Sequence, residues 1–437
     1  MDLGQRATEL LVELIRIKTV NPPGNERRAQ EVIKSYLEEA GMECRLAGAE
    51  PERQNLIATL KGDGLGKSLC YLGHIDTVLA NPSEWSVDPW GGEITDGCVW
   101  GRGALDMKGQ VAAEVVACAQ LARSGWRPST GELKLVICCD EEVGGALGAQ
   151  WLCNTLPDQI RADYIVNEGG GSLIPFADRR LYGLCVGEKG VYRFTLATEG
   201  RAAHASTPAV GDNALLKMAP LLERLSGWQS SLESSPEADG LFDSLLGSNG
   251  VVSNAVDPQL LVERAREVDP RAALLLEPMF GMTIAPTMIR ASEKLNVVPS
   301  QCQLHVDCRV PPGRQEEYVR ARLEEALADE RYELTFDEPI LGNRSPAQGV
   351  LVDAIAAFVA QEDPGASLAP ILLPGFTDSN WFRSAFDCVA YGFFPQRTMD
   401  IYESMPLIHG ADERIPIADL EYGTKFFHYL APRLLDD

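Results

Sequence analysis

The sequence has no apolar run of about 18 residues, the shortest stretch that usually spans a membrane as a helix. It also has no internal repeats and no low-complexity tails. Hydrophobic residues nevertheless make up 45% of its 437 residues, which is enough for a large buried core. We therefore expect a soluble globular protein, and its length predicts two domains, one of which can be inserted in the other.

Cationic residues are scarce. The chain has 39 Lys and Arg against 63 Asp and Glu, and its formal net charge is -24. Nucleic acids and anionic membranes bind proteins through clustered Lys and Arg, so neither is expected as a partner.

Paired cysteine motifs are also missing. The 11 cysteines are an odd number, are scattered through apolar segments and form no Cys-x-x-Cys pair. This pattern is typical of reduced thiols in a cytoplasmic protein and disfavours both a disulfide framework and a structural cysteine-zinc site. The first helical pattern, in which Leu10, Leu11, Leu14 and Ile15 share one face, differs from a signal peptide.

The most informative stretch is the apolar segment Leu133–Cys138 and the three acids that follow it, Asp140, Glu141 and Glu142. The pattern predicts a buried strand that carries carboxylates at its C-terminal end. Adjacent carboxylates repel one another and lose hydration on burial, so cations are expected beside them. An acidic turn exposed to water is the alternative.

A second strand pattern, Ser68–Gly73, ends in His74-Ile75-Asp76. Residues two apart in an extended chain project to the same side, so the imidazole of His74 and the carboxylate of Asp76 can meet. A neighbouring carboxylate fixes the tautomer of a metal-bound histidine. A chance His-x-Asp without a metal is the alternative.

Two further segments carry acids beside glycines. Asp106 lies in the glycine-rich loop at 100–109, and Glu168 follows the short apolar strand at 162–167. In α/β sheets, sites form at the carboxyl ends of strands, so these residues can converge with His74. The alternative for Asp106 is an ordinary N-cap of the helix that follows.

From Glu188 onward the pattern changes to a β-α-β-β-α-β order, which predicts a small two-layer domain. Residues 228–280 exceed what this unit needs and are expected to be a partly helical insertion. The α/β pattern returns at 349 and continues to a last helix. We therefore predict a first domain built from 1–186 and 341–437, with a second domain, 187–340, inserted in it.

Two histidines and three carboxylates supply enough ligands for two divalent ions if one acid bridges them: His74, His409, Asp106, Glu142 and Glu168. Mixed imidazole and carboxylate ligands suit zinc, or cobalt or manganese. A site with two metals activates water and polarises a carbonyl. Glu141 is left over; on an extended chain it points away from Glu142, and we expect it to be the general base.

Four motifs together resemble the dinuclear zinc aminoacylase and carboxypeptidase family, which includes acetylornithine deacetylase, succinyl-diaminopimelate desuccinylase, aminoacylase and bacterial glutamate carboxypeptidase. They occur in the family's order with similar gaps, and the resemblance covers nearly the whole chain. The motifs are Gly73-His74-x-Asp76-x-Val78, Gly101-Arg102-Gly103-x-x-Asp106-Met107-Lys108-Gly109, Asp140-Glu141-Glu142-Val143-Gly144-Gly145 and Asn167-Glu168-Gly169.

The resemblance implies an α/β fold: a zinc-peptidase-like catalytic domain with a central mixed sheet flanked by helices, and an inserted α+β, ferredoxin-like lid or dimerisation domain. It also implies a role for each residue of the site. Asp106 would bridge the metals, His74 and Glu168 would complete one site, and Glu142 and His409 would complete the other. Asp76 would orient His74, Glu141 would move the proton from water to the leaving nitrogen, and the Asp106-Met107 peptide would be cis.

Other matched residues are implied to act on the substrate. His204 would stabilise the oxyanion, often from the partner subunit of a homodimer, and Asn296 and Arg309 would grip a substrate carboxylate. Gly375 and Thr377 are expected to contact substrate as well. The alternatives are a polar loop histidine, a surface ion pair of Arg309 and a simple turn at Thr377.

The resemblance thus implies a metal-dependent hydrolase that cleaves the amide bond of N-acyl amino acids or short peptides with a free carboxylate, through a metal-bound water with Glu141 as general base. A metal-binding homologue without activity and a dizinc aminopeptidase without the inserted domain are the alternatives. The insertion at 228–280 resembles longer members of the family that act on peptides or fatty acyl amino acids. Phe376 stands where relatives often have a small residue, which would narrow the pocket.

Overall fold

A large mixed sheet forms the centre of the molecule in the computed structural model, which describes residues 2–233, 235–246, 257–328 and 330–436. Parallel pairing joins β3 to β6 and β7, β7 to β19, and β18 to β9, whereas the other pairs are antiparallel. The strands are β1 (Glu43–Glu50), β2 (Arg53–Lys61), β3 (Ser68–His74), β6 (Glu132–Cys138), β7 (Tyr164–Asn167), β8 (Leu173–Phe176), β9 (Arg179–Glu188), β17 (Asn343–Arg344), β18 (Ser367–Leu373) and β19 (Val389–Gly392).

Helices cover both faces of this sheet, as expected for strands that are apolar at every position. On β3, Leu69 and Tyr71 belong to one core and Cys70 and Leu72 to the other. The first core contains α1 (Leu3–Arg16), α2 (Arg27–Glu38), α3 (Lys108–Arg123), α11 (Val350–Glu362) and α14 (Ile417–Leu435); the second contains α4 (Ala149–Thr155), α5 (Pro157–Ile160) and α12 (Ser379–Ala385). The predicted central mixed sheet flanked by helices is confirmed.

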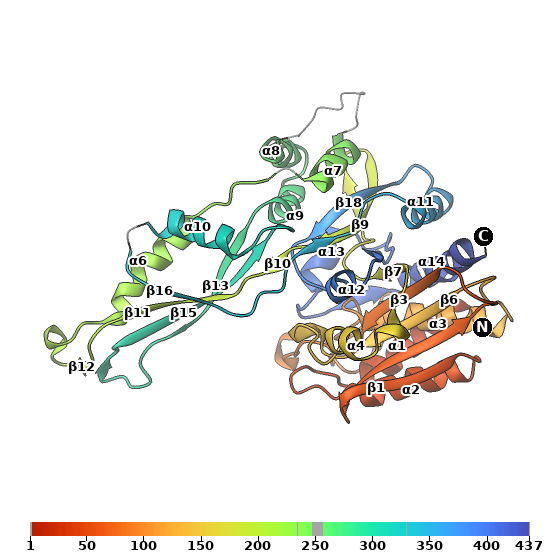
Figure 1. Cartoon of the computed structure of the whole chain (residues 1–437), viewed down its shortest axis with the longest axis horizontal. Helices are drawn as coiled ribbons and strands as arrows, with labels where there is room; N and C mark the ends of the chain where they lie inside the picture. The colour runs from red at the N-terminus through yellow and green to blue at the C-terminus, as the bar shows by residue number, and fades with distance from the viewer. Residues whose placement is uncertain (1, 234, 247–256, 329, 437) are drawn as a thin grey trace.

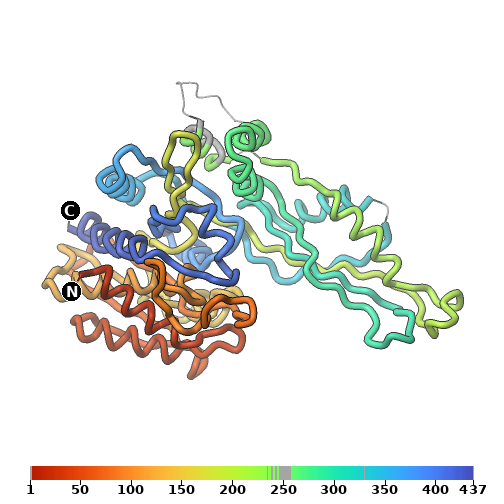
Figure 2. The backbone as a smooth tube through the Cα atoms, turned by 180° about the vertical axis from the view of Figure 1, so that it is seen from behind, coloured from red at the N-terminus to blue at the C-terminus, as the bar shows by residue number. Residues whose placement is uncertain are grey.

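A second, antiparallel sheet extends away from the first as an elongated arm (Figures 1 and 2). We call residues 190–227 and 283–336, without 329, the arm. Its strand order β16-β11-β15-β13, with two helices between strands, is the predicted β-α-β-β-α-β arrangement. The elements are β10 (Gly190–Val191), β11 (Phe194–Glu199), α6 (Ala214–Gly227), β13 (Thr283–Arg290), β15 (Gln301–Val310), α10 (Glu316–Leu327) and β16 (Glu333–Phe336). The exact domain boundaries stay a prediction.

The far end of the arm carries two short paired strands, β12 (Ala203–His204) and β14 (Val297–Val298) (Figure 1). Beside the large sheet lie a small sheet and several single turns of helix. They are β4 (Glu93–Thr95), β5 (Cys98–Trp100), β20 (Arg414–Pro416), α13 (Ile401–Ser404), η1 (Pro82–Glu84), η2 (Glu141–Val143) and η4 (Met405–Leu407). A further single turn, η3 (Pro208–Val210), lies on the arm.

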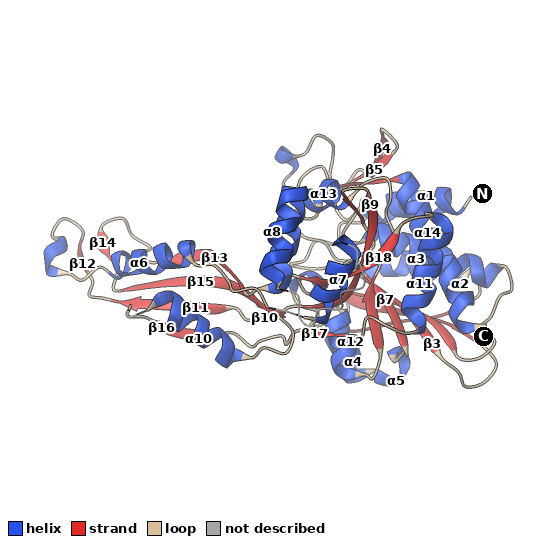
Figure 3. Ribbon diagram, turned by 90° about the horizontal axis from the view of Figure 1, so that it is seen from above, coloured by secondary structure: helices blue, strands red, loops and turns tan. Residues whose placement is uncertain are grey.

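The segment predicted as an insertion forms three helices in its described part: α7 (Pro236–Leu246), α8 (Pro258–Val268) and α9 (Pro270–Phe280). Residues 247–256 lie outside the described residues. These inserted helices share a core with β8, β9 and β18 of the large sheet, and Figure 3 shows α7 beside β18. Although the insertion interrupts the arm in sequence, its apolar faces pack on the large sheet.

All eleven cysteines lie in the described ranges and each is a free thiol, as predicted. A bilayer-spanning helix is absent from the described part of the chain, where none combines the necessary length and apolarity.

Lys189 joins the end of β9 to the inserted helices. Its ammonium group is buried and donates to the carbonyl oxygens of Pro278 at 2.9 Å and Gly281 at 2.6 Å. Burial lowers the pKa of Lys189 to about 7. A lysine whose pKa is lower in the folded than in the unfolded state destabilises the protein while it is charged, so stability rises as pH increases from about 7.

We therefore expect Lys189 to add on the order of 1–2 kcal/mol to the free energy of unfolding between pH 7 and about pH 9. Thermal unfolding of the wild type and of Lys189→Met across this range measures the contribution. The increase should be smaller in Lys189→Met, whereas Lys61→Met, at an exposed lysine, should keep the slope of the wild type. Equal slopes in all three proteins would contradict the assignment.

Candidate metal centre

His74 lies at the carboxyl end of β3, where the apolar run of the strand stops in the middle of the large sheet. Its side chain is 1% exposed, and its Nδ1 atom lies 3.1 Å from the carbonyl oxygen and 3.3 Å from the carboxylate of Asp76. The expected contact between the two side chains is present. Asp76 also accepts hydrogen bonds from the backbone N–H groups of Glu141 and Glu142, both at 3.2 Å.

The acids after β6 do not continue an extended chain, which corrects the prediction made for Glu141 and Glu142. Asp140 has φ 76° and begins the short 3-10 helix η2, Glu141–Val143. The carboxylate of Asp140 accepts from Arg53 at 2.7 Å and from the backbone N–H of Leu147 at 2.9 Å. A turn, and not strand alternation, therefore separates Glu141 from Glu142.

Asp106 is fixed by a carboxylate that the sequence patterns did not single out. Glu413, which is fully buried, accepts from the backbone N–H groups of Leu105 at 2.7 Å and Asp106 at 3.1 Å and from the Arg102 guanidinium at 2.6 Å. The Asp106-Met107 peptide is cis, as the resemblance implied. The N-cap of α3 is Met107, so Asp106 is not the cap.

The two carboxylate oxygens of Asp106 face two different histidines. Oδ1 lies 3.1 Å from Nε2 of His74, and Oδ2 lies 3.0 Å from Nε2 of His409. Glu168 lies 3.5 Å from Nε2 of His74, and Glu142 lies 3.1 Å from Nε2 of His409. Asp106 thus stands between two clusters of ligand atoms, in the position that a bridging ligand needs.

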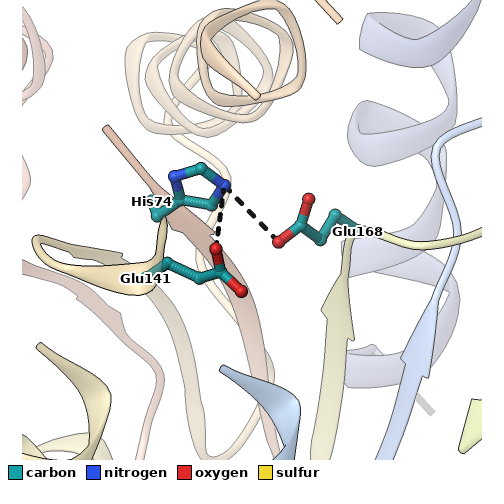
Figure 4. Close-up of side chains that lie close together, drawn as sticks. All are labelled: His74, Glu141 and Glu168. Atoms are coloured by element: carbon teal, nitrogen blue, oxygen red, sulfur yellow. Dashed lines mark ion pairs between the residues drawn. The ribbon is translucent and has the colours of Figure 1, made fainter. Parts of the chain in front are cut away.

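Glu141 belongs spatially to the first of these clusters. Figure 4 shows its carboxylate directed at the His74 ring together with that of Glu168, and its Oε2 atom lies 3.9 Å from Nε2 of His74. The ligand atoms of His74, Glu141 and Glu168 lie within 4.8 Å of one another, and so do those of Asp106, Glu142 and His409. Glu141 is therefore close enough to reach a metal or a water held at the first cluster.

The surrounding acids raise the pKa values of both histidines. Burial opposes protonation of His74, but the carboxylates of Glu168 and Asp106 outweigh it and raise its pKa well above the usual value. Hydrogen bonds to Asp106 and Glu142 raise the pKa of His409 to about 10. Both rings are thus held in a field of negative charge.

The pKa values of two of the carboxylates are also raised. Burial raises the pKa of Glu168 to about 7, and burial followed by the nearby charge of Glu168 raises the pKa of Glu141 well above its usual value. Four carboxylates and two imidazoles therefore share a largely buried space with an excess of negative charge. This donor set fits two divalent cations, for which imidazole and carboxylate are ordinary ligands.

A cavity of about 410 Å³ opens beside both clusters. Its volume lies in the range of small-molecule sites. Asp106, Glu141, Glu142, Glu168 and His409 line one part of it, and Gly375, Phe376 and Thr377 line another.

A sequence profile of peptidase family M20/M25/M40 matches residues 70–433. The chain belongs to this family. A succinyl-diaminopimelate desuccinylase of Rhodospirillum centenum is 37% identical over 224 residues, which are 49% of this chain and 55% of that protein, so the match spans about half the length of that relative. The human N-fatty-acyl-amino acid synthase/hydrolase PM20D1 is 27% identical over 404 residues, 87% of this chain and 76% of that protein.

The fold of this M20-family chain is similar to that of the M20 family metallo-carboxypeptidase Sso-CP2 from Sulfolobus solfataricus. The TM-score is 0.73 at 18% identity, and the alignment covers 99% of this chain and 100% of that chain. The resemblance inferred from the four motifs is thereby confirmed.

Three predicted substrate residues of the M20-family chain do not line the cavity of their own chain. His204 is exposed on β12, at the far end of the arm in Figure 1, and its Nδ1 lies 2.7 Å from the Ser206 hydroxyl. Asn296 is close to it, since its carbonyl accepts from the Ala205 N–H at 3.0 Å. Arg309 forms an ion pair with Asp307 at 2.7 Å. By contrast, Gly375 and Thr377 line the cavity, and their contact with substrate stays a prediction.

Two more buried residues near the clusters escaped the sequence patterns. Asn21 donates to Asp76 at 2.8 Å and to Asp140 at 3.1 Å, and so joins two of the acidic segments. Asp378 is 1% exposed, and neither carboxylate oxygen has a hydrogen-bond partner. Apolar periodicity could not have identified either residue, because both lie in polar turns.

We expect the purified protein to bind about two divalent ions per chain, because two clusters of ligand atoms share Asp106. Each bound ion should stabilise the fold by about 2.7 kcal/mol at a metal concentration 100 times its dissociation constant. Elemental analysis and thermal unfolding, before and after chelation and zinc addition, measure both effects.

In the same assay, Asp106→Asn should lose most of the bound metal, and Glu142→Gln should lose about one equivalent of the two. Asp178→Asn, at an exposed acid, is the matched control and should bind as the wild type does. Full metal content in Asp106→Asn would refute the bridging position.

Proposed function

We propose that this protein is a metal-dependent hydrolase that cleaves the amide bond of N-acyl amino acids or of short peptides with a free carboxylate. The observation that supports it most is the carboxylate of Asp106, whose two oxygens face His74 and His409 at 3.1 and 3.0 Å beside a cavity. Family membership supports the same chemistry. The printed names of relatives include both succinyl and fatty-acyl substrates and so leave the acyl group open.

Five residues would hold the ions, zinc or else cobalt or manganese: His74 and Glu168 at one, Glu142 and His409 at the other, and Asp106 between them. When bound, such ions polarise the substrate carbonyl and lower the pKa of water. Asp76 would hold the ring of His74 through Nδ1, leaving Nε2 free to face the cluster.

Glu141 would act as the general base. Its carboxylate is directed into the first cluster, and it lines the cavity in which the substrate carbonyl would lie. It would accept a proton from the attacking water and deliver that proton to the leaving nitrogen as the C–N bond breaks. The backbone N–H groups of Glu141 and Glu142 donate to Asp76, which holds this turn against β3.

The free carboxylate of the substrate would be held by groups of the arm. Asn296 and Arg309 are the proposed ligands, and His204 is proposed to stabilise the oxyanion. Because His204 and Asn296 lie together at the far end of the arm, we propose that a second copy of the chain in a homodimer supplies them. Gly375 and Thr377 would contact the substrate within the cavity.

The dizinc aminopeptidase alternative required a chain without the β-α-β-β-α-β unit, and the arm has that unit. A binding protein without activity is disfavoured by the position of Glu141 beside His74. The cytoplasmic location stays a prediction from the free cysteines.

Substituting the proposed base separates catalysis from metal binding. In Glu141→Gln, hydrolysis of an N-acyl amino acid should fall by about 10²- to 10⁴-fold, because a general base contributes that much. Zinc content should remain near that of the wild type, whereas Glu142→Gln should lose metal and activity together. Release of free amino acid and elemental analysis are the two measurements, and wild-type turnover by Glu141→Gln would refute the proposed base.

Mixing two inactive variants tests whether His204 acts across a dimer. His204→Ala and Glu141→Ala should each be nearly inactive. In their heterodimer, however, one of the two sites is complete, because it combines the intact Glu141 of one chain with the intact His204 of the other. If subunits exchange randomly, an equal mixture should regain about a quarter of wild-type activity. No recovery, in a mixture shown to contain heterodimers, would place His204 outside the reaction or in its own subunit.

A further inference from the structure

The cavity beside the metal clusters extends well beyond them into apolar space. Its acidic end holds Asp106, Glu142, Glu168 and His409, but most of its remaining wall is aliphatic. The inserted helices α7 and α9 supply one side of this wall, and β18 supplies the facing side. None of the groups proposed to act in hydrolysis requires an aliphatic wall, so the apolar extension calls for a separate explanation.

The wall on the inserted helices is built by helical spacing. Ala272, Leu275, Leu276 and Met279 recur on one face of α9, and all four line the cavity. The opposite face of the same helix points to solvent, where Leu274 is 72% exposed. The inserted helices thus present a continuous aliphatic surface to the cavity.

On α7, Leu241 and Leu245 are one turn apart and also line the cavity, opposite Ile371 of β18. All three side chains are buried, with exposed fractions of 1%, 4% and 7%. Without the inserted helices, this part of β18 would be open to water. The insertion therefore closes the apolar part of the cavity.

Charge decides which half of a substrate fits there. Among the described residues that line the cavity, none is Lys or Arg. Two buried cations of the neighbouring segments have other partners: Lys189 donates to the carbonyls of Pro278 and Gly281, and Arg383 pairs with Glu188 at 2.6 Å. A carboxylate placed in the apolar part would be buried among aliphatic side chains without a cation, which is costly.

On the proposed function, the amide carbonyl lies at the clusters, and the two halves of the substrate leave it in different directions. The amino-acid half ends in a carboxylate, and the apolar part of the cavity offers that carboxylate no cation. The amino-acid half therefore does not fit there. We infer that the apolar cavity is an acyl-chain site, and that the preferred substrates are amino acids N-acylated with a long aliphatic chain. Water adds to the acyl carbon, the C–N bond breaks, and a fatty carboxylate and an amino acid are released.

The inference predicts a graded dependence on chain length. Each methylene that enters the cavity should improve kcat/KM by about fourfold, the equivalent of about 0.8 kcal/mol per buried methylene, until the cavity is full. The gain should fall mainly on KM, because the chain makes the same contacts in the ground state and the transition state. A succinyl group should be a poor substrate, since its distal carboxylate would enter the apolar part.

The first experiment compares N-acetyl, N-butyryl, N-octanoyl, N-dodecanoyl and N-succinyl derivatives of one amino acid with the zinc-loaded full chain. We expect kcat/KM to rise along the unbranched series and to be low for the succinyl compound. N-acetyl-phenylalanine tests the other occupant, an apolar side chain of the amino acid. If it is preferred over N-dodecanoyl-glycine, the acyl assignment is overturned.

The second experiment fills the cavity. Ala272→Phe places a ring in the wall of α9 and should lower the ratio of dodecanoyl to acetyl kcat/KM at least tenfold. Leu274→Phe, two residues away on the solvent face of the same helix, is the matched control and should keep the wild-type ratio. If Ala272→Phe does not fold, Leu275→Trp makes the same test at a less buried position of the wall. An unchanged ratio in a folded cavity variant overturns the inference.

Direct binding separates this inference from the proposed function. Dodecanoic acid, the product of the longest substrate, is titrated calorimetrically into zinc-loaded Glu141→Gln with and without Ala272→Phe. Binding that Ala272→Phe abolishes supports the acyl-chain site even if no amide is hydrolysed, in which case only the proposed function fails. Hydrolysis of acetyl substrates without a chain-length effect and without dodecanoate binding overturns the inference and leaves the proposed function standing.

Discussion

The hydrogen bonds that Glu413 accepts are the constraint on which both ligand clusters depend. This buried carboxylate holds the backbone of the loop before α3 through Leu105 and Asp106, and its ion pair with Arg102 closes the loop from the other side. Arg102 also donates to the carbonyl oxygen of His409 at 3.2 Å, so the same pair positions the last ligand of the chain. A bridging carboxylate must face both clusters at once, and small shifts of its loop would lose one of them. The proposed ligands thus rely on a residue that holds the backbone of Asp106 but is not itself a proposed ligand.

Three parts of the fold divide the work of the site. The large sheet carries the clusters at the ends of β3, β6 and β7, where the chain leaves a rigid, fully covered strand and can place side chains reproducibly. The arm holds His204 and its neighbours away from the cavity of their own chain. The inserted helices, which interrupt the arm in sequence, pack on the large sheet and shape the cavity.

Much of this arrangement was predictable, because strand ends leave clear patterns in sequence. Continuous apolar runs followed by His74 and by Glu168 predicted the strands that lead into the site, and counting imidazoles and carboxylates predicted two ion sites joined by one acid. The family resemblance, and not the count, pointed to Asp106 as that acid. The turn at Asp140 was not predicted, because a left-handed residue leaves no periodic signal when it is not a glycine. Nor was the role of Glu413, since a carboxylate that binds backbone N–H groups is identical in sequence to one that faces water.

The position of the inserted helices was also beyond sequence patterns. Their helical spacing shows that they have an apolar face, but not which of two sheets that face meets, because both sheets offer apolar partners. Their placement separates two properties within the gene: the ligands lie before residue 170 and after residue 400, whereas one wall of the cavity comes from a single continuous stretch between α6 and β13. Mutations in that stretch can reshape the cavity without touching a proposed ligand, so on the proposed function substrate preference and chemistry are free to evolve independently.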